Sequence, residues 1–296
     1  MRSAILGGVA ALAFAGALVG LHVWSAHGVQ DIAAPAHLDV PAAGVTLPMQ
    51  SLGGRPVVEV TIEGKGPYRF ILDTAASSNV IDTALQEELG LPSVLADAVT
   101  PTGAAVTLVK VSTLRVGGAT LSGLTAAALP VARLFPAQPR PRGVLSALAF
   151  PGHLVTFDYP AARISIVRGE LAAEDGARTF SYAGDPLPAL PLRVAGHDVR
   201  VHLDTGAETG LTLPRRYLEE LPLASKPVAS GKTRTPTGET TILAAKVAGP
   251  ITLGAHALDL GDVRFGDVSP GTLGYAGLRT FVVTLDSRRH RVRLER

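Results

Sequence analysis

The sequence reads FILDTAAS at residues 70–77 and VHLDTGA at residues 201–207. Each stretch is a mostly apolar, strand-like run that ends in Asp-Thr and continues into very small residues. Such a run predicts a β-strand that leads into a tight turn, at a place where backbones approach closely. Asp73 and Asp204 therefore hold the same position in two copies of one local structure, and this duplication decides the fold that we expect.

The sequence around the two turns is also repeated. A strand with alternating apolar residues is predicted at 57–62 before the first turn, and another at 190–194 before the second. A short helix is predicted after each turn, at 81–89 and at 214–221. The two copies therefore share more than one motif.

Two further pairs of segments complete the repeat. TPTG occurs at 100–103 and at 235–238, each time between strand-like runs, and this predicts the tips of two β-hairpins. GVLS at 143–146 aligns with GTLG at 271–274, and each leads into the last strands of its copy. We expect two homologous lobes.

The composition agrees with an all-β protein. The chain has 296 residues with 32 Gly, 22 Pro and only 5% aromatic residues, which suits many short strands and turns around an aliphatic core. The expected order is an export segment at 1–27, a tether at 28–50, a first lobe at 51–168, a linker at 169–185 and a second lobe at 186–296. We call residues 51–168 the first half and residues 186–296 the second half.

Several classes of protein are excluded by composition. The chain has no cysteine, which excludes disulfides, thiolate nucleophiles and cysteine-bound metals. Its net charge is +2 and its basic residues are scattered, so we expect no nucleic-acid partner. His197 and His202 have no third ligand at a suitable spacing, so we expect no metal and no cofactor.

The N-terminus has the pattern of an export signal. Arg2 precedes an uncharged stretch from Ser3 to Leu21, and Trp24 follows where an interfacial aromatic residue would lie. This stretch is slightly long for a signal peptide and just long enough to span a membrane. Both a removed signal peptide and a membrane tether through residues 3–24 remain open, and either one predicts a periplasmic or extracellular location.

Two carboxylates that face each other have a definite chemistry. If Asp73 and Asp204 lie together, both cannot ionise easily, so they share a proton and supply an acid and a base at one pH. A water molecule between them can then be deprotonated while the protonated partner bonds the carbonyl under attack. The sequence predicts hydrolysis of peptide bonds without metal or nucleophilic side chain.

With these motifs the chain resembles the retropepsin-like bacterial aspartyl proteases. The resemblance covers nearly everything after residue 50 and implies two closed-barrel-like lobes, each with one or two short helices. It implies that Asp73 and Asp204 are catalytic and that Thr74 and Thr205 join the lobes by hydrogen bonds. Support of the active-site loops is expected from Thr74, Ala75, Thr205, Gly206, Ser146 and Gly274.

The resemblance also implies how a peptide substrate binds. The two hairpins are expected to close over an extended peptide that lies in the cleft as an added strand. Candidate substrate-binding residues are Ser77, Glu208, Thr102, Gly103, Thr237 and Gly238. Since both aspartates are present in one chain, we expect a monomer, with an obligate dimer as the alternative.

The first half departs from the family pattern at two positions. Ala75 stands where the second half has Gly206, and Ser146 stands where it has Gly274. Each adds a side chain that could displace Asp73 or crowd the water, and a displacement on the order of 1 Å can lower a rate strongly. A catalytically degenerate protein that only binds peptides is therefore the main alternative.

Other charged residues have simpler explanations. Asp158 and Asp286 match each other and precede the last strand of each half, so we interpret them as turn residues. The arginines near the C-terminus are expected to decorate a solvated edge strand, where charge discourages pairing with another chain. They are Arg288, Arg289, Arg291, Arg293 and Arg296.

Overall fold

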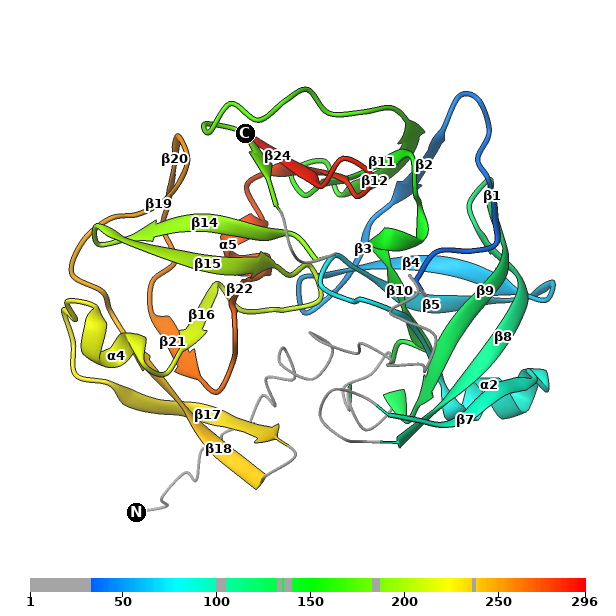
Figure 1. Cartoon of the computed structure of the whole chain (residues 1–296), viewed down its shortest axis with the longest axis horizontal. Coiled ribbons are helices and arrows are strands. Elements are labelled where there is room, and N and C mark those ends of the chain that lie inside the picture. Colours follow the sequence, from blue (N-terminus) through cyan, green and yellow to red (C-terminus); the bar gives the residue numbers. More distant parts are fainter. Residues whose placement is uncertain (1–32, 100–104, 132–134, 136–139, 183–186, 236–237) are drawn as a thin grey trace, which may run out of the picture.

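The protein is mostly β-sheet. A computed structural model describes residues 33–99, 105–131, 135, 140–182, 187–235 and 238–296. Within these ranges the strands form three sheets, two with nine strands and one with six (Figure 1). No helix in the same ranges is long and apolar enough to cross a membrane. The predicted export segment at residues 1–27 lies outside the described residues.

The first nine-stranded sheet contains the first aspartate. Its order is β1-β9-β6-β10-β5-β4-β8-β7, with β3 also paired to β4. Because β8 also pairs with β9, a circuit of six strands closes on itself. The strands are β1 (His37–Asp39), β3 (Gln50–Leu52), β4 (Arg55–Ile62), β5 (Lys65–Asp73), β6 (Asn79–Asp82), β7 (Ser93–Val99), β8 (Ala105–Val116), β9 (Ala119–Leu129) and β10 (Gly143–Ser146).

The second nine-stranded sheet contains the second aspartate. Its order is β17-β18-β21-β16-β22-β15-β14-β19-β20, and no described pairing closes it into a circuit. The two halves therefore differ in closure, although closed-barrel-like lobes were expected in both. The strands are β14 (Ala189–Val194), β15 (His197–Leu203), β16 (Leu211–Pro214), β17 (Val228–Thr235), β18 (Gly238–Ala245), β19 (Ile251–Leu253), β20 (His256–Leu258), β21 (Val263–Gly266) and β22 (Gly271–Leu273).

The same three-strand arrangement surrounds each aspartate. In the first half, β10 runs parallel to β5 and antiparallel to β6. In the second half, β22 runs parallel to β15 and antiparallel to β16. The GVLS and GTLG segments are thus the central strands of equivalent groups, as their alignment in the sequence suggested.

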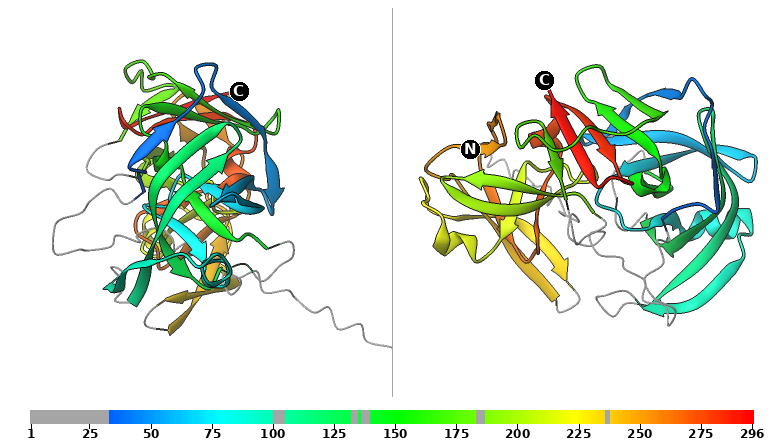
Figure 2. Two further views of the ribbon diagram at one scale, coloured as in Figure 1. Left: turned by 90° about the vertical axis from the view of Figure 1, so that its right-hand side faces the viewer. Right: turned by 45° about the horizontal axis from the view of Figure 1, so that its top comes forward.

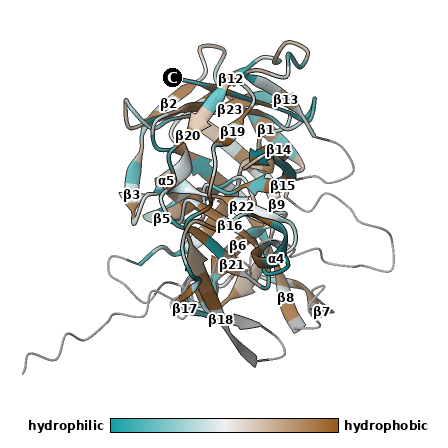
Figure 3. Ribbon diagram, turned by 90° about the vertical axis from the view of Figure 1, so that its left-hand side faces the viewer, coloured by the Kyte–Doolittle hydropathy of each residue, from teal (hydrophilic) through white to brown (hydrophobic). Residues whose placement is uncertain are grey.

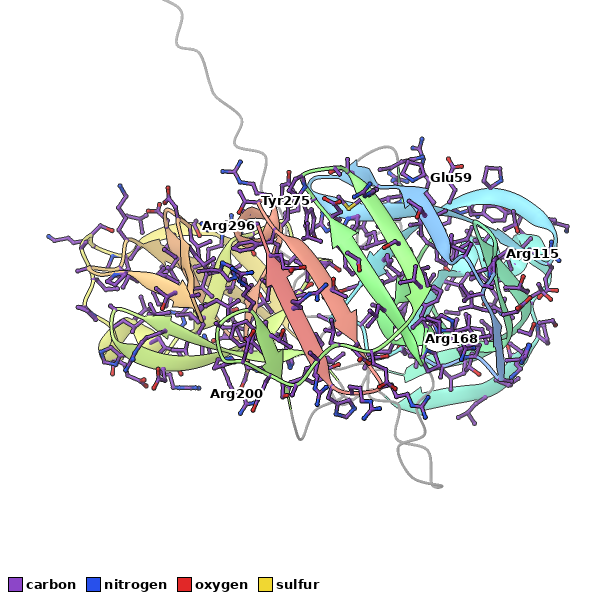
Figure 4. The ribbon with its side chains drawn as sticks, turned by 90° about the horizontal axis from the view of Figure 1, so that it is seen from above. Glu59, Arg115, Arg168, Arg200, Tyr275 and Arg296 are labelled. Atoms are coloured by element: carbon purple, nitrogen blue, oxygen red, sulfur yellow. The ribbon has the colours of Figure 1, made fainter. Side chains whose placement is uncertain are left out.

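A six-stranded sheet joins the halves. Its order is β13-β24-β23-β11-β12-β2, and β11 of the first half pairs with β23 of the second (Figure 2). Seen from above, β23 and β24 lie beside β11 and β12 in the middle of the molecule (Figure 4). The strands are β2 (Val45–Pro48), β11 (His153–Asp158), β12 (Arg163–Arg168), β13 (Thr179–Ser181), β23 (Val282–Asp286) and β24 (Arg291–Glu295).

One hydrophobic core runs through both halves. Along β4, Val58, Val60 and Ile62 are buried while Glu59 is exposed, as the alternation in the sequence predicted. The main cluster extends from such residues in the first half to Leu294 in the last strand. Figure 3 shows the hydrophobic residues along β16 and β21 inside the second half. Burial shared in this way holds the two active-site strands in a fixed relation.

The short helices agree with the sequence only in part. Helix α2 (Thr83–Leu89) has Asp82 as its N-cap residue and ends at Gly90, whose φ of 66° is left-handed. Helix α4 (Tyr217–Glu220) is shorter than the predicted 214–221, because Pro214 is the last residue of β16 instead. The others are the 3₁₀ helix η1 (Ala147–Ala149) and α5 (Tyr275–Leu278).

The predicted tether and linker contain strands. Within residues 28–50, β1 pairs with β9 and β2 pairs with β12, so the described part of this segment belongs to the sheets. Within residues 169–185, β13 pairs with β24. The sequence did not predict these strands, because they are short and pair with partners far along the chain, which Ala, Pro and Gly content does not reveal.

The arginine-rich strand is not an edge strand. β24 lies between β23 and β13, so the predicted edge position is wrong. Two arginines, one in the turn before β24 and one in β24, hold the linker instead: Arg289 forms an ion pair with Glu170 at 2.6 Å, and Arg291 donates to the carbonyl of Leu171. Asp286 accepts hydrogen bonds from the backbone of Leu171 and Arg289, which agrees with a role in the turn.

Candidate active site

The two predicted active-site turns meet and are joined by four hydrogen bonds. The backbone N–H of Thr74 donates to Oγ1 of Thr205 at 3.1 Å, and the backbone N–H of Thr205 donates to Oγ1 of Thr74 at 3.1 Å. Each hydroxyl then donates across the interface to a strand carbonyl, Thr74 to Leu203 and Thr205 to Leu72. Both threonines are fully buried, so these bonds fix the turns against each other without competition from water.

The two aspartates are buried beside these threonines. Asp73 is 2% exposed and Asp204 is 3% exposed. The backbone N–H of Ala75 donates to Oδ1 of Asp73 at 2.8 Å. The carboxylate of Asp73 also lies against the α-carbon of Gly206, where a side chain would overlap with it. The second turn therefore needs glycine at this position to make room for the carboxylate of the first.

Burial raises the pKa of both aspartates, and the charge of Asp73 raises that of Asp204 further. For Asp73, burial raises the pKa to about 6, although the N–H groups of Ala75 and Gly206 and the charge of Arg55 act in the opposite direction. For Asp204, burial and then the negative charge of Asp73 raise the pKa well above its usual range. The pair therefore loses its protons in two separate steps. Between these steps one carboxyl group is ionised and the other is protonated.

The loop that follows the aspartate is held by a side-chain donor in the first half and by a backbone donor in the second. In the first half, the hydroxyl of Ser146 donates to the carbonyl of Ala76 at 2.6 Å and accepts from the backbone of Leu148. In the second half, the backbone N–H of Tyr275 donates to the carbonyl of Ala207 at 2.9 Å. Ser146 thus supplies a hydrogen bond of its own within the loop, at one of the two departures from the family pattern.

Glycine is required at the equivalent position of the second half. A side chain on Gly274 would overlap with the backbone of Thr209 and with Ala207. The two halves therefore form the same closed turn from different residues.

Arg55 is a further residue of the site that the sequence did not reveal. It is 9% exposed and donates through Nε to the carbonyl of Gly206 at 2.6 Å. Its guanidinium forms an ion pair with Glu208 and lies 5.2 Å from the ring centroid of Phe135. Arg55 therefore links the first half to the active-site turn of the second.

The hairpin turn before Arg55 fits closely against the second half. Gly53 and Gly54 connect β3 to β4 with φ values of 59° and 91°. A side chain on Gly53 would overlap with Glu208, and one on Gly54 would overlap with the ring of Tyr275. The only local sign of this contact in the sequence was that the charged Arg55 directly precedes the apolar residues of β4.

Tyr159 is a second residue that sequence reasoning missed. The centroid of its ring lies 5.8 Å from that of Tyr275, and its buried hydroxyl has no hydrogen-bond partner within the part of the chain that the structure describes. Burial, and then the charges of Asp204 and Asp73, raise its pKa. Tyr159 thus packs near the aspartates as a neutral side chain.

The predicted substrate-binding residues lie in unlike surroundings. The hydroxyl of Ser77, four residues after Asp73, is buried and has no hydrogen-bond partner among the described residues. Glu208, four residues after Asp204, is exposed and paired with Arg55. The end of the site beside Glu208 is therefore charged, whereas the end beside Ser77 carries a free hydroxyl.

The predicted hairpins are present up to their tips. β7 pairs with β8 and β17 pairs with β18, both antiparallel. Gly238 is the first residue of β18, and Thr102, Gly103 and Thr237 lie outside the described residues. Among the residues that are described, no three His, Asp or Glu side chains lie together as a metal site.

Comparison with known families finds a match within the first half of the chain. A family model described as aspartyl protease matches residues 58–147, which include Asp73 and Ser146. The match supports assignment of this chain to a retropepsin-like aspartyl protease family. It ends before the second turn, so Asp204 lies outside it. A search of curated protein sequences finds no match.

Proposed function

We propose that this protein is an aspartic endopeptidase in which Asp73 and Asp204 activate a water molecule. The observation that carries the proposal is the reciprocal hydrogen bonding of Thr74 and Thr205, which holds two buried carboxylates on facing turns. The family match of residues 58–147 supports a peptidase. Nothing in this mechanism requires a cofactor.

The two carboxyl groups have different roles. Asp73, whose pKa is raised to about 6, is the group that ionises first and acts as the general base toward water. Asp204, whose pKa is raised further by the charge of Asp73, keeps its proton and donates a hydrogen bond to the substrate carbonyl. Proton transfer to the leaving nitrogen then completes the hydrolysis without a covalent intermediate.

The proposed substrate is an extended peptide bound between two lobes of an aspartic-protease fold. The lobes correspond to residues 51–168 and 186–296, and the hairpins β7–β8 and β17–β18 close over the peptide. Ser77 and Glu208 contact it at opposite ends. One chain supplies both aspartates, so the active form is a monomer. The apolar stretch at residues 3–21 and Trp24 support an exported protein that remains tethered to a membrane.

Removal of one carboxyl group tests the mechanism directly. Asp204→Asn keeps the size of the side chain but leaves Asp73 without an acidic partner, so we expect cleavage of a peptide library by the full-length protein to fall by about 10³-fold or more. Asp262→Asn, an exposed change in the same half, serves as the control. Equal cleavage by Asp204→Asn and the wild type would exclude the mechanism.

A protein that binds peptides without cleaving them is the second candidate. It is favoured by Ala75, which puts a methyl group into a turn where the other half has glycine. Binding and cleavage are separated by incubating a fluorescent peptide library with the wild type and following both anisotropy and product formation. Saturable binding with no product, at any pH between about 4 and 8, supports this candidate and contradicts the endopeptidase.

A further inference from the structure

The described chain begins with a residue that is fixed inside the protein. Ala33 is fully buried and packs against Leu148 and Leu187. Its carbonyl accepts a hydrogen bond from Nδ2 of Asn79 at 2.9 Å. Ala33 is therefore part of the folded body and not of a free tether.

The residues after Ala33 are also held in place. The methyl group of Ala36 lies against the backbone of Gly123, where an added side chain would overlap with it. From His37 onward the chain forms β1, which pairs with β9. Any free connection to the N-terminal apolar stretch must end before Ala33, so it is much shorter than the tether that the sequence predicted at 28–50.

Ala33 is attached next to the first active-site turn. Oδ1 of Asn79, the residue that holds Ala33, accepts from the backbone N–H of Ser146 at 3.1 Å. The hydroxyl of Ser146 in turn donates to Ala76, three residues after Asp73. One side chain and one hydrogen-bonded loop therefore separate the attachment point from the catalytic turn.

The attachment point lies at the end of the site without the charged pair. Val57 pairs with Ile71 and Ala189 pairs with His202, each partner standing two residues before an aspartate. By this register Leu187, which packs on Ala33, takes the place in the second half that Arg55 holds in the first. Arg55 pairs with Glu208 at one end of the site, and the chain enters beside Leu187 at the other.

The length of the connecting segment follows from the sequence. If the apolar stretch ends at Trp24, only residues 25–32 remain before Ala33. Eight residues span at most about 28 Å when fully extended. Ala33 then lies within about 28 Å of the membrane surface.

We propose that this short tether makes the protein a protease of membrane-proximal segments. The proposal rests on the endopeptidase function and the tether proposed above. Its substrates are extended segments of membrane proteins that lie next to their spans on the outer side of the membrane. A cleft held near such segments meets them at a high effective concentration, whereas it cannot meet sites that lie farther from the membrane than the tether and the folded body together can reach.

Reporters with one cleavage site at two heights test the proposal. The site is a peptide that the full-length enzyme cleaves in solution. It is placed either next to the span of a single-span protein or above a rigid helical stalk of about 70 residues, roughly 105 Å long. Enzyme and reporter are reconstituted in the same vesicles, and we expect the near site to be cut at least about tenfold faster.

Two insertions between Ala26 and His27 provide matched variants. A helical spacer of about 40 residues, roughly 60 Å long, is expected to abolish the preference for the near site or reverse it. A Gly/Ser linker of the same length is expected to make the two sites nearly equal. Neither insertion touches the folded body, so both variants should cleave the soluble peptide at the wild-type rate.

The outcomes separate this proposal from the function on which it rests. Equal cleavage of both sites by the wild type, or a mature protein whose N-terminal sequence begins after residue 24, would overturn the short tether while leaving the protease intact. If the protein cleaves no soluble peptide, the endopeptidase function itself is wrong. A near-site preference that the helical spacer does not change would also contradict the proposal.

Discussion

The two active-site turns have the same shape but are built from different residues. The first has Ala75, Ser77 and the hydroxyl of Ser146, and the second has Gly206 and Glu208 with the backbone of Tyr275 in the role of Ser146. The reciprocal threonine hydrogen bonds are nearly symmetric, since both backbone bonds are 3.1 Å long. The bonds that join the turns are thus alike in the two halves, whereas the residues around them have diverged.

The ends of the site differ for the same reason. Arg55 and Glu208 place an ion pair at one end, and Leu187 and Ser77 place an apolar residue and an unpaired hydroxyl at the other. A homodimer with the same turns would have two identical ends. The single chain can instead distinguish the two directions of a bound peptide, and it has one end free to receive the N-terminal connection at Ala33.

Among the variants that test how the two turns differ, Gly206→Ala is expected to lower activity the most. The new methyl group would overlap with the carboxylate of Asp73, so we expect kcat/KM for a peptide substrate to fall by about 100-fold or more. The reverse change in the other turn, Ala75→Gly, removes a methyl group without creating an overlap and should alter kcat/KM by less than about threefold. Steady-state kinetics with both variants tests this, and similar losses in the two would show that the turns are not different in this respect.

A smaller effect is expected when Ser146 loses its hydroxyl. Ser146→Ala leaves the carbonyl of Ala76 and the N–H of Leu148 without their partner, which costs about 1–3 kcal/mol of unfolding free energy. Ser146→Gly places the residue of the second half in the first half but should be no more stable than Ser146→Ala. The reason is that no described hydrogen bond of the first half corresponds to the one from the backbone N–H of Tyr275. Urea unfolding measures both, and an increase in stability for Ser146→Gly is the result that would refute the role of the hydroxyl.

The smallest expected effect is a shift in pH dependence when Arg55 is removed. Activity requires one ionised and one protonated carboxyl group, so it should rise as pH passes the first pKa, at about 6 for Asp73. The charge of Arg55 lowers the pKa of both aspartates. Arg55→Met should therefore move the acid limb of kcat/KM to higher pH, by up to about one unit.

Arg142→Met provides a matched control for this shift. Arg142 pairs with Glu88 and Asp82 in the first half, away from the aspartates, so its removal should leave the pH profile unchanged. An Arg55→Met profile that coincides with the wild type, or that moves to lower pH, would show that Arg55 does not act on the carboxyl groups.

Much of the fold and of the site was predictable from the sequence, because both depend on local patterns that occur twice. The strands that carry Asp73 and Asp204, and helix α2 with its cap at Gly90, follow from alternation and turn residues. Arg55 could not be predicted, because its partners lie more than 150 residues away in the second half. The strands within the expected tether were missed for a similar reason: β1 and β2 are short, and their stability comes from partners far along the chain.

The central claim is that Asp73 and Asp204 act as one catalytic unit, and a double-mutant cycle measures it. The peptide-cleavage rates of Asp73→Asn, Asp204→Asn and the double variant are compared with the wild type under the same conditions. If the two carboxyl groups share one task, each single variant should lose about as much activity as the double variant. If the losses instead multiply, or if either single variant keeps its activity, the two aspartates do not form a dyad and the proposed mechanism is wrong.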